Sequence, residues 1–201
     1  MQSLSKSGDL PQWLVDKLRN VVQNAPIEDI SNAHVAGAVI AQVSDKELAK
    51  LNQHHSYRLL DEPTKIVVRA VLEHLKITVT EFLDSAWTVL NVRSWTTKMG
   101  ASMGPNKWHL DQDDPRVLKL MIYGTPTGGK YGGLEFEGGK LNGESWILFY
   151  SSLLKHCAIA PTEEGIERVA TEVTLCRSSK YDLEPKFLGF TARYPENTEF
   201  L

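Results

Sequence analysis

From residue 86 onward the sequence is a series of short segments rich in β-forming residues, separated by turn-forming stretches such as TPTGGKYGG, GGKLNG and PTEEG. Many short strands at close spacing are typical of a β-sandwich or barrel, including the jelly roll. The chain is therefore restricted to a layered, mainly antiparallel β core. The expected strands are 86–95, 116–124, 133–138, 145–151, 166–176 and 187–194.

The first 85 residues have a different pattern, in which apolar residues recur at the spacing of a helix face. The helix signals are Trp13, Leu14, Leu18, Val21 and Val22 on one face, a capping box of Ser44 and Glu47, Pro63 in the first turn of a helix through Leu75, and Thr78 with Glu81 at a further helix start. We predict an α+β protein of one domain (1–201), in which a mainly helical annex (1–85) packs against a β core (86–201).

The charge and the cysteine content indicate which kinds of partner and which cellular compartment to expect. The formal net charge of the 201 residues is −3, whereas nucleic-acid-binding domains are usually basic. Two cysteines do not make a disulfide framework, and no apolar run has the length of a signal peptide or a membrane span. We expect a cytoplasmic protein whose partner is neither a nucleic acid nor a membrane.

The sequence Trp108-His109-Leu110-Asp111 contains a possible metal-binding pair. Side chains alternate between the two faces of a strand, so His109 and Asp111 point the same way and can bind one ion. His156, in LLKHCAIAP, supplies a third ligand. Two histidines and one carboxylate form the facial triad of non-haem Fe(II) oxygenases, which leaves coordination positions open.

Arg168 follows His156 by 12 residues, and the stretch between them contains the turn-forming sequence PTEEG. We predict a hairpin about this turn, which would place His156 and Arg168 nearly opposite each other on paired strands, facing one cavity. A guanidinium in an apolar strand needs an anionic partner, and its two-pronged geometry matches a carboxylate. A dicarboxylic 2-oxo acid would chelate the metal at one end and reach Arg168 with the other.

Residues 86–194 resemble the Fe(II)/2-oxoglutarate-dependent dioxygenase superfamily, whose pattern of His-x-Asp/Glu, a distal His and then an Arg or Lys is matched by His109, Asp111, His156 and Arg168. The resemblance implies a double-stranded β-helix (jelly-roll, cupin-like) fold. It implies that Fe(II), 2-oxoglutarate and dioxygen are used, and that decarboxylation of 2-oxoglutarate to succinate is coupled to hydroxylation of a substrate.

The branch of the superfamily is left open between phytanoyl-CoA dioxygenase-like and prolyl-hydroxylase-like proteins. The Trp-His-x-Asp start and the strand LKLMIYG are similar to the former group, while Arg168 differs from the Lys typical of prolyl hydroxylases. AlkB-type repair enzymes usually have a second Arg six residues after the first, where this chain has Thr174. The substrate is expected to be a small molecule or a protein side chain.

Further site residues are predicted from their places on neighbouring strands. Tyr123 and Asn91 are candidates for binding 2-oxoglutarate, and Arg93 shares a strand face with Asn91 unless that face is turned to solvent. His54 and His55 are interpreted as a solvated helix end. The loop 96–107 is a hypothesis for a mobile lid.

Two other functions compete with the dioxygenase. One is a cupin-like metalloenzyme that does not use 2-oxoglutarate, which would leave Arg168 without an assigned partner. The other is a metal- or ligand-binding module without turnover.

Overall fold

The computed structural model describes residues 3–28, 54–102, 106–111, 113–188, 194–195 and 197–201. The helices in this part of the chain are α1 (Gln12–Asn24), α3 (Glu62–Leu83) and the 3-10 helix η2 (Gly129–Tyr131). The strands are β1 (Ser5–Gly8), β2 (His55–Arg58), β3 (Trp87–Lys98), β4 (Val117–Tyr123), β5 (Gly133–Phe136), β6 (Gly139–Lys140), β7 (Trp146–Phe149), β8 (His156–Ile159) and β9 (Glu167–Arg177).

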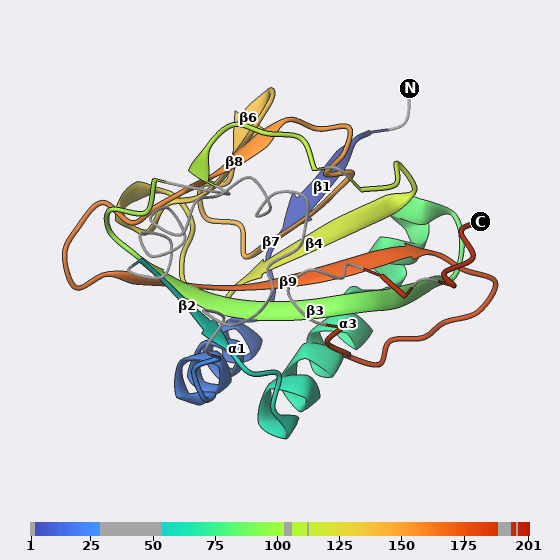
Figure 1. Cartoon of the computed structure of the whole chain (residues 1–201), viewed down its shortest axis with the longest axis horizontal. Coiled ribbons are helices and arrows are strands. Elements are labelled where there is room, and N and C mark those ends of the chain that lie inside the picture. The colour runs from blue at the N-terminus through green and yellow to red at the C-terminus, as the bar shows by residue number, and fades with distance from the viewer. Residues whose placement is uncertain (1–2, 29–53, 103–105, 112, 189–193, 196) are drawn as a thin grey trace.

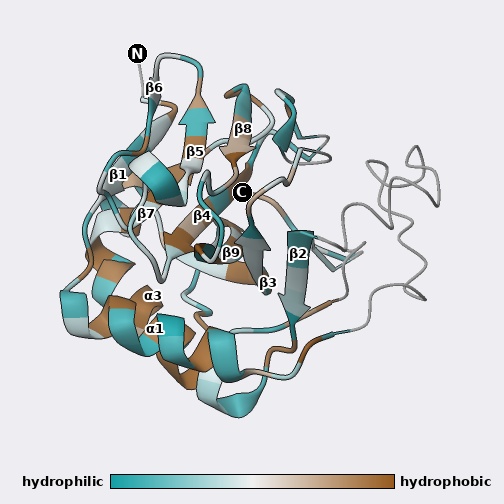
Figure 2. Ribbon diagram, turned by 90° about the vertical axis from the view of Figure 1, so that its left-hand side faces the viewer, coloured by the Kyte–Doolittle hydropathy of each residue, from teal (hydrophilic) through white to brown (hydrophobic). Residues whose placement is uncertain are grey.

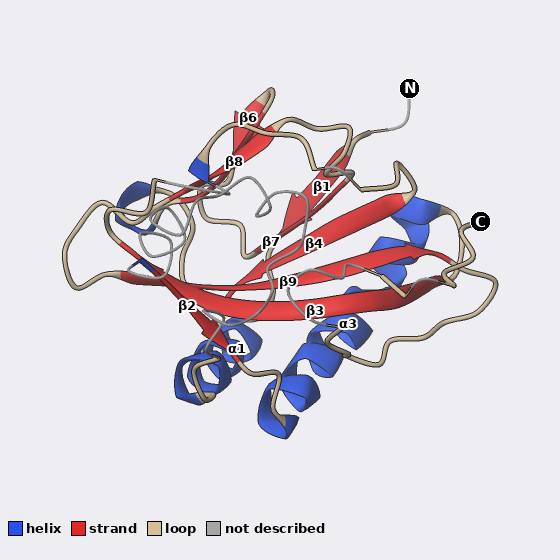
Figure 3. Cartoon of the chain, in the orientation of Figure 1, coloured by secondary structure: helices blue, strands red, loops and turns tan. Residues whose placement is uncertain are grey.

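The strands form two antiparallel sheets. The larger has the order β1-β7-β4-β9-β3-β2, and the smaller has the order β6-β5-β8. Helices α1 and α3 cover one face of the large sheet, and the small sheet lies over its other face (Figures 1 and 3). Strands distant in sequence are neighbours, since β9 pairs with both β3 and β4. This arrangement is that of a jelly roll.

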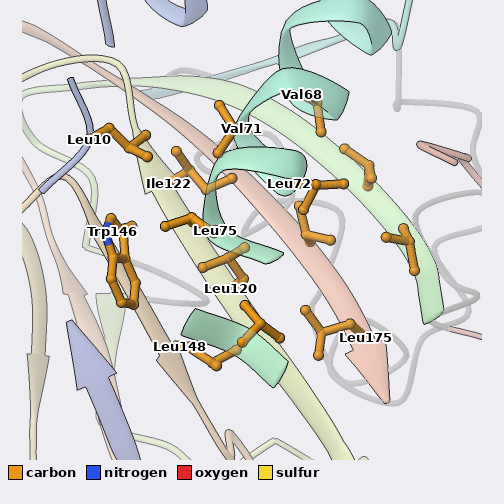
Figure 4. Close-up of a cluster of buried hydrophobic side chains, with 14 of the residues drawn as sticks. Leu10, Val68, Val71, Leu72, Leu75, Leu120, Ile122, Trp146, Leu148 and Leu175 are labelled. Carbon is orange, nitrogen blue, oxygen red and sulfur yellow. The ribbon is translucent and has the colours of Figure 1, made fainter. Parts of the chain in front are cut away.

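Helix α3 joins the large sheet through the apolar residues on one side of the helix. It begins after Asp61, whose side chain accepts a hydrogen bond from the backbone N–H of Thr64 at 3.0 Å, and Pro63 lies in its first turn as predicted. Figure 4 shows Leu72 and Leu75 packing toward Leu120 of β4, and Figure 2 shows the apolar faces of both helices turned to the sheet.

Strand β4 divides its side chains between two environments. Leu118, Leu120 and Ile122 belong to the core beneath the helices, while Met121 and Tyr123 belong to a second cluster on the other side of the sheet. The alternation of side chains along a strand produces this division. The second face, turned toward the small sheet, is the one that carries polar and charged residues.

Five of the six predicted strands are confirmed, as β3, β4, β5, β7 and β9. No strand is present at residues 187, 188 and 194, and 189–193 lie outside the described residues. The helix start predicted at Thr78 is wrong, because α3 continues through Leu83. Trp13, predicted on the buried face of α1, is 56% exposed.

The predicted annex 1–85 also contributes strands. β1 pairs with β7 at one edge of the large sheet, and β2 pairs with β3 at the other. The capping box at Ser44 and Glu47 lies outside the described residues, so the helical layer as a whole stays a prediction. Within the described ranges, no helix has both the length and the apolar character needed to cross a bilayer.

Truncating Leu72 tests the helix–sheet core. Leu72 is 0% exposed, whereas Ile77 on the same helix is 73% exposed. We expect Leu72→Ala to lower the free energy of unfolding by about 2–5 kcal/mol, because it removes buried methyl groups and leaves a cavity. Ile77→Ala should change it by no more than about 0.5 kcal/mol. Urea unfolding of both variants measures the difference, and equal losses would contradict this assignment of the core.

Candidate functional site

His109 and His156 lie opposite each other in an isolated antiparallel bridge. The N–H of each donates to the carbonyl of the other, both at 3.0 Å, and the N–H of Asp111 donates to Ser151 O at 3.0 Å. Residues 108–111 therefore run alongside the start of β8, although they do not form a strand. Residues paired in this way project their side chains from the same face.

The three predicted ligands come together at this pairing. One ligand atom from each of His109, Asp111 and His156 lies within 4.8 Å of the others. The Nε2 of His109 is 3.8 Å from Asp111 Oδ1, and the Nε2 of His156 is 3.8 Å from Asp111 Oδ2. This cluster of two nitrogens and one carboxylate is the donor set preferred by ferrous iron in oxygenases.

Backbone carbonyls orient both imidazole rings. Nδ1 of His109 lies 2.6 Å from Lys107 O, and Nδ1 of His156 lies 2.9 Å from Leu154 O. A carbonyl only accepts hydrogen bonds, so each Nδ1 carries the proton and each Nε2 keeps a lone pair for a metal. Burial lowers the pKa of His156 to about 4. Its ring is neutral at ordinary pH, as metal binding requires.

The two histidines of the triad line a cavity between the two sheets. The cavity is open on one side, and the space within it, including the part that is continuous with solvent, is about 430 Å³. Its walls combine apolar residues with several charged ones: Trp95, His109, Lys119, Met121, Tyr123, Leu134, Phe149, His156, Ala158, Arg168, Ala170 and Glu172.

Arg168 belongs to a different sheet from His156, and the hairpin predicted between them is wrong. Strand β8 pairs with β5 in the small sheet, whereas β9 pairs with β3 and β4 in the large sheet. The turn at 161–165 carries the chain from one sheet to the other and does not fold it back within one sheet. His156 and Arg168 still line the same cavity.

Arg168 is almost completely buried, at 2% exposure. Its guanidinium donates from Nη1 to the carbonyls of Gly133 and Ile159, and from Nη2 to Thr97 Oγ1 at 3.3 Å. Its Nε is buried without a hydrogen-bond partner. Among the described residues no carboxylate lies within ion-pair distance of it. Burial lowers the pKa of Arg168, and an uncompensated buried cation is costly. This group is suited to bind an anion in the cavity.

Tyr123 and Asn91, predicted as a pair, lie in different surroundings. Tyr123 lines the cavity, and burial raises the pKa of its phenol to about 12, so the phenol keeps its proton as a hydrogen-bond donor. Asn91 does not line the cavity. Its Oδ1 accepts the N–H of Leu188 at 3.0 Å and so ties β3 to the C-terminal segment. The structure gives no support to Asn91 as a co-substrate ligand.

A buried charge network in the cavity was not predicted from the sequence. Lys119 Nζ lies 2.7 Å from Asp111 Oδ2 and 3.2 Å from Glu172 Oε2, and Glu172 also pairs with Arg93. Arg93 therefore faces the interior and not solvent. A single charge in an apolar strand, the signal that identified Arg168, is also present at Lys119 and Glu172.

His55 is not part of a solvated helix end, because it begins β2 and is 4% exposed. Its Nδ1 lies 3.1 Å from Thr97 Oγ1, the same hydroxyl that Arg168 contacts. The predicted loop 96–107 is also shorter than expected. Strand β3 continues to Lys98, Asn106 Nδ2 donates to Ala158 O at 2.8 Å, and 103–105 lie outside the described residues.

The protonation of His55 tests whether this residue is buried beside Thr97 and Arg168. Burial and then the charge of Arg168 lower the pKa of His55 to about 4, with His54 adding to the shift and the Asn106 side chain opposing it. Between about pH 6.5 and pH 4 the unfolded chain binds a proton at His55 that the folded chain does not, so stability falls as pH falls. We expect His55→Gln to reduce this slope by up to about 1.4 kcal/mol per pH unit.

Urea unfolding of the metal-free protein at several pH values measures the slope. His74→Gln is the matched control, because it makes the same substitution at an exposed histidine on α3. Identical slopes for His55→Gln and the unsubstituted protein would contradict the prediction.

Comparison with known proteins shows the fold. No family model matches the sequence, and a search of curated proteins found no match. Among solved structures, ThoJ, a non-heme monooxygenase in complex with nickel, has a TM-score of 0.58 at 11% identity, with 98% of this chain and 87% of that chain covered. HygX from Streptomyces hygroscopicus, with nickel and 2-oxoglutarate bound, has a TM-score of 0.55 at 10% identity, with 87% and 82% covered.

A third similar structure is EctD from S. alaskensis with 2-oxoglutarate and 5-hydroxyectoine, with a TM-score of 0.56 at 10% identity and coverage of 96% and 81%. At these identities the likeness concerns the arrangement of the chain and not its substrate. The chain therefore shares the jelly-roll fold of these three proteins.

Proposed function

We propose that this protein is an Fe(II)- and 2-oxoglutarate-dependent oxygenase that couples decarboxylation of 2-oxoglutarate to succinate with hydroxylation of a substrate. The observation that carries the proposal is one cavity lined both by the histidines of a two-histidine, one-carboxylate cluster and by a buried arginine that has no carboxylate partner among the described residues. The fold shared with 2-oxoglutarate complexes supports it.

His109, Asp111 and His156 would hold the ferrous ion. The two Nε2 atoms are presented to the cluster because each Nδ1 is bound to a carbonyl, and His156 is held neutral by burial. Three protein ligands leave open the positions that a chelating 2-oxo acid and dioxygen need. The bound ion supplies the oxidising chemistry when dioxygen and the 2-oxo acid are present.

Arg168 and Tyr123 would hold the far carboxylate of 2-oxoglutarate. The free Nε of Arg168 and the protonated phenol of Tyr123 offer donors on the wall facing the triad. Carbonyls and Thr97 fix the rest of the guanidinium, so it is already oriented before an anion arrives. The surrounding apolar side chains exclude water and strengthen the charge interaction.

The substrate in this proposal is a small molecule or a protein side chain that reaches the open side of the cavity. We further propose that residues 1–201 act as one domain in the cytoplasm. The pairing of β1 and β2 with the β core supports a single domain. The two buried free cysteines fit a reducing compartment.

Anaerobic addition of Fe(II) and then 2-oxoglutarate to the metal-free protein tests the proposal without a substrate. We expect a visible metal-to-ligand charge-transfer band that is absent in His109→Ala, because chelation of the 2-oxo acid requires the ion that this residue helps to hold. Iron binding without the band would favour a cupin-like metalloenzyme that does not use 2-oxoglutarate. Absence of iron binding would exclude the oxygenase and leave a binding module without turnover as the remaining function.

Arg168→Ala should separate co-substrate binding from metal binding. We expect Fe(II) affinity to be retained and 2-oxoglutarate affinity to fall by on the order of 100-fold or more, as when one partner of a buried charge pair is removed. Calorimetric titration of the Fe(II)- or Mn(II)-loaded protein measures both. Arg116→Ala, which removes an exposed arginine paired with Asp114, is the control and should bind normally. Normal binding by Arg168→Ala would refute this role.

A further inference from the structure

Lys119 is a buried cation in contact with a proposed metal ligand. It lies on β4, is 6% exposed, and directs its side chain into the cavity, while its neighbours Leu118 and Leu120 pack beneath the helices. Its ammonium group lies 2.7 Å from Asp111 Oδ2. No step of the proposed function uses this contact.

The position of Lys119 is fixed by the sheet. Glu172 on β9 lies 3.2 Å from Nζ of Lys119 through Oε2 and pairs with Arg93 through Oε1. Arg93 and Glu172 are directly opposite each other in the β3–β9 pairing. Three adjacent strands thus hold an alternating row of charges, Arg93, Glu172 and Lys119, that ends at Asp111. Such a network is rigid when its members are paired.

The ammonium group of Lys119 lies against one oxygen of Asp111, Oδ2. Oδ1 lies 3.8 Å from Nε2 of His109, and Oδ2 lies 3.8 Å from Nε2 of His156, so the imidazoles do not distinguish them. The ammonium group of Lys119 forms an ion pair with Oδ2. A divalent cation near Oδ2 would meet the charge of Lys119 at short range, and repulsion between like charges in a cavity is strong.

We propose that Lys119 is a positioning residue that reserves Oδ2 of Asp111 and so makes this carboxylate a metal ligand through Oδ1 alone. The proposal rests on the proposed function. If a six-coordinate ion were bound, ligation through one oxygen would leave three of its positions open, whereas ligation through both would leave two. A chelating 2-oxo acid together with dioxygen needs three. Lys119 therefore protects co-substrate binding and is not required for metal binding.

Lys119→Met tests this role, because methionine keeps an unbranched side chain and removes the charge and the donors. We expect the Fe(II)-loaded variant to bind 2-oxoglutarate on the order of 10- to 100-fold more weakly, because Oδ2 could then take a position on the ion that the co-substrate needs. The Fe(II) affinity should be unchanged or higher, since a neighbouring cation is lost. The dissociation constant of 2-oxoglutarate is measured from the charge-transfer band, and that of Fe(II) by anaerobic competition with a chelating dye.

Three companion variants make the result specific. Lys119→Arg retains a cation that can reach Oδ2 and should recover most of the 2-oxoglutarate affinity. Lys119→Met/Glu172→Gln removes one charge of each sign, so the cavity keeps its net charge, and it serves if the single variant does not fold. Lys186→Met removes a lysine that is 3.0 Å from Asp182 outside the cavity and should bind both ligands normally.

A selective loss of 2-oxoglutarate affinity that Lys119→Arg recovers supports the proposal. Unchanged 2-oxoglutarate affinity in folded Lys119→Met overturns it, and so does an equal loss of Fe(II) and 2-oxoglutarate affinity. Failure of the proposed function is recognised separately, because the unsubstituted protein would then show no charge-transfer band.

Discussion

The alternation of side chains along β4 and β9 is the constraint on which the rest of the structure depends. Both strands are buried on their two faces along almost their whole length, but the two faces are chemically different. Leu118 and Leu120 of β4 pack under the helices, while Lys119 between them reaches the cavity. A slip of one residue in register would place the ammonium in the apolar core and the leucines beside the metal ligands. Core packing and site chemistry therefore select the same register.

The charges in the cavity fall into two groups with different requirements. Arg93, Glu172, Lys119 and Asp111 are paired with one another, so their desolvation is offset within the protein. Arg168 is bound to carbonyls and a hydroxyl but to no described carboxylate. The charges of the first group have partners of opposite sign within the protein, whereas Arg168 would gain such a partner from a bound anion. This contrast identifies the end of the cavity at which an anion is expected.

Alternation and motif spacing predicted five strands and placed His109, Asp111, His156 and Arg168 around one cavity. The hairpin failed because it assumed that strands adjacent in sequence pair with each other, whereas in this fold the turn at 161–165 leads from one sheet to the other. No local signal distinguishes these two kinds of turn. Strands β1 and β2 were missed because four-residue edge strands have almost no periodicity and depend on tertiary pairing.

The pairing of His109 with His156 has an evolutionary consequence. The spacing of these two side chains is set by a pair of reciprocal backbone hydrogen bonds and does not depend on which residues stand beside them. Trp108 and Leu110, the chain neighbours of His109, are both largely exposed. Mutations at such neighbours can change what approaches the cavity without moving the ligands. A scaffold of this kind can acquire new specificities while its reactive centre stays in place.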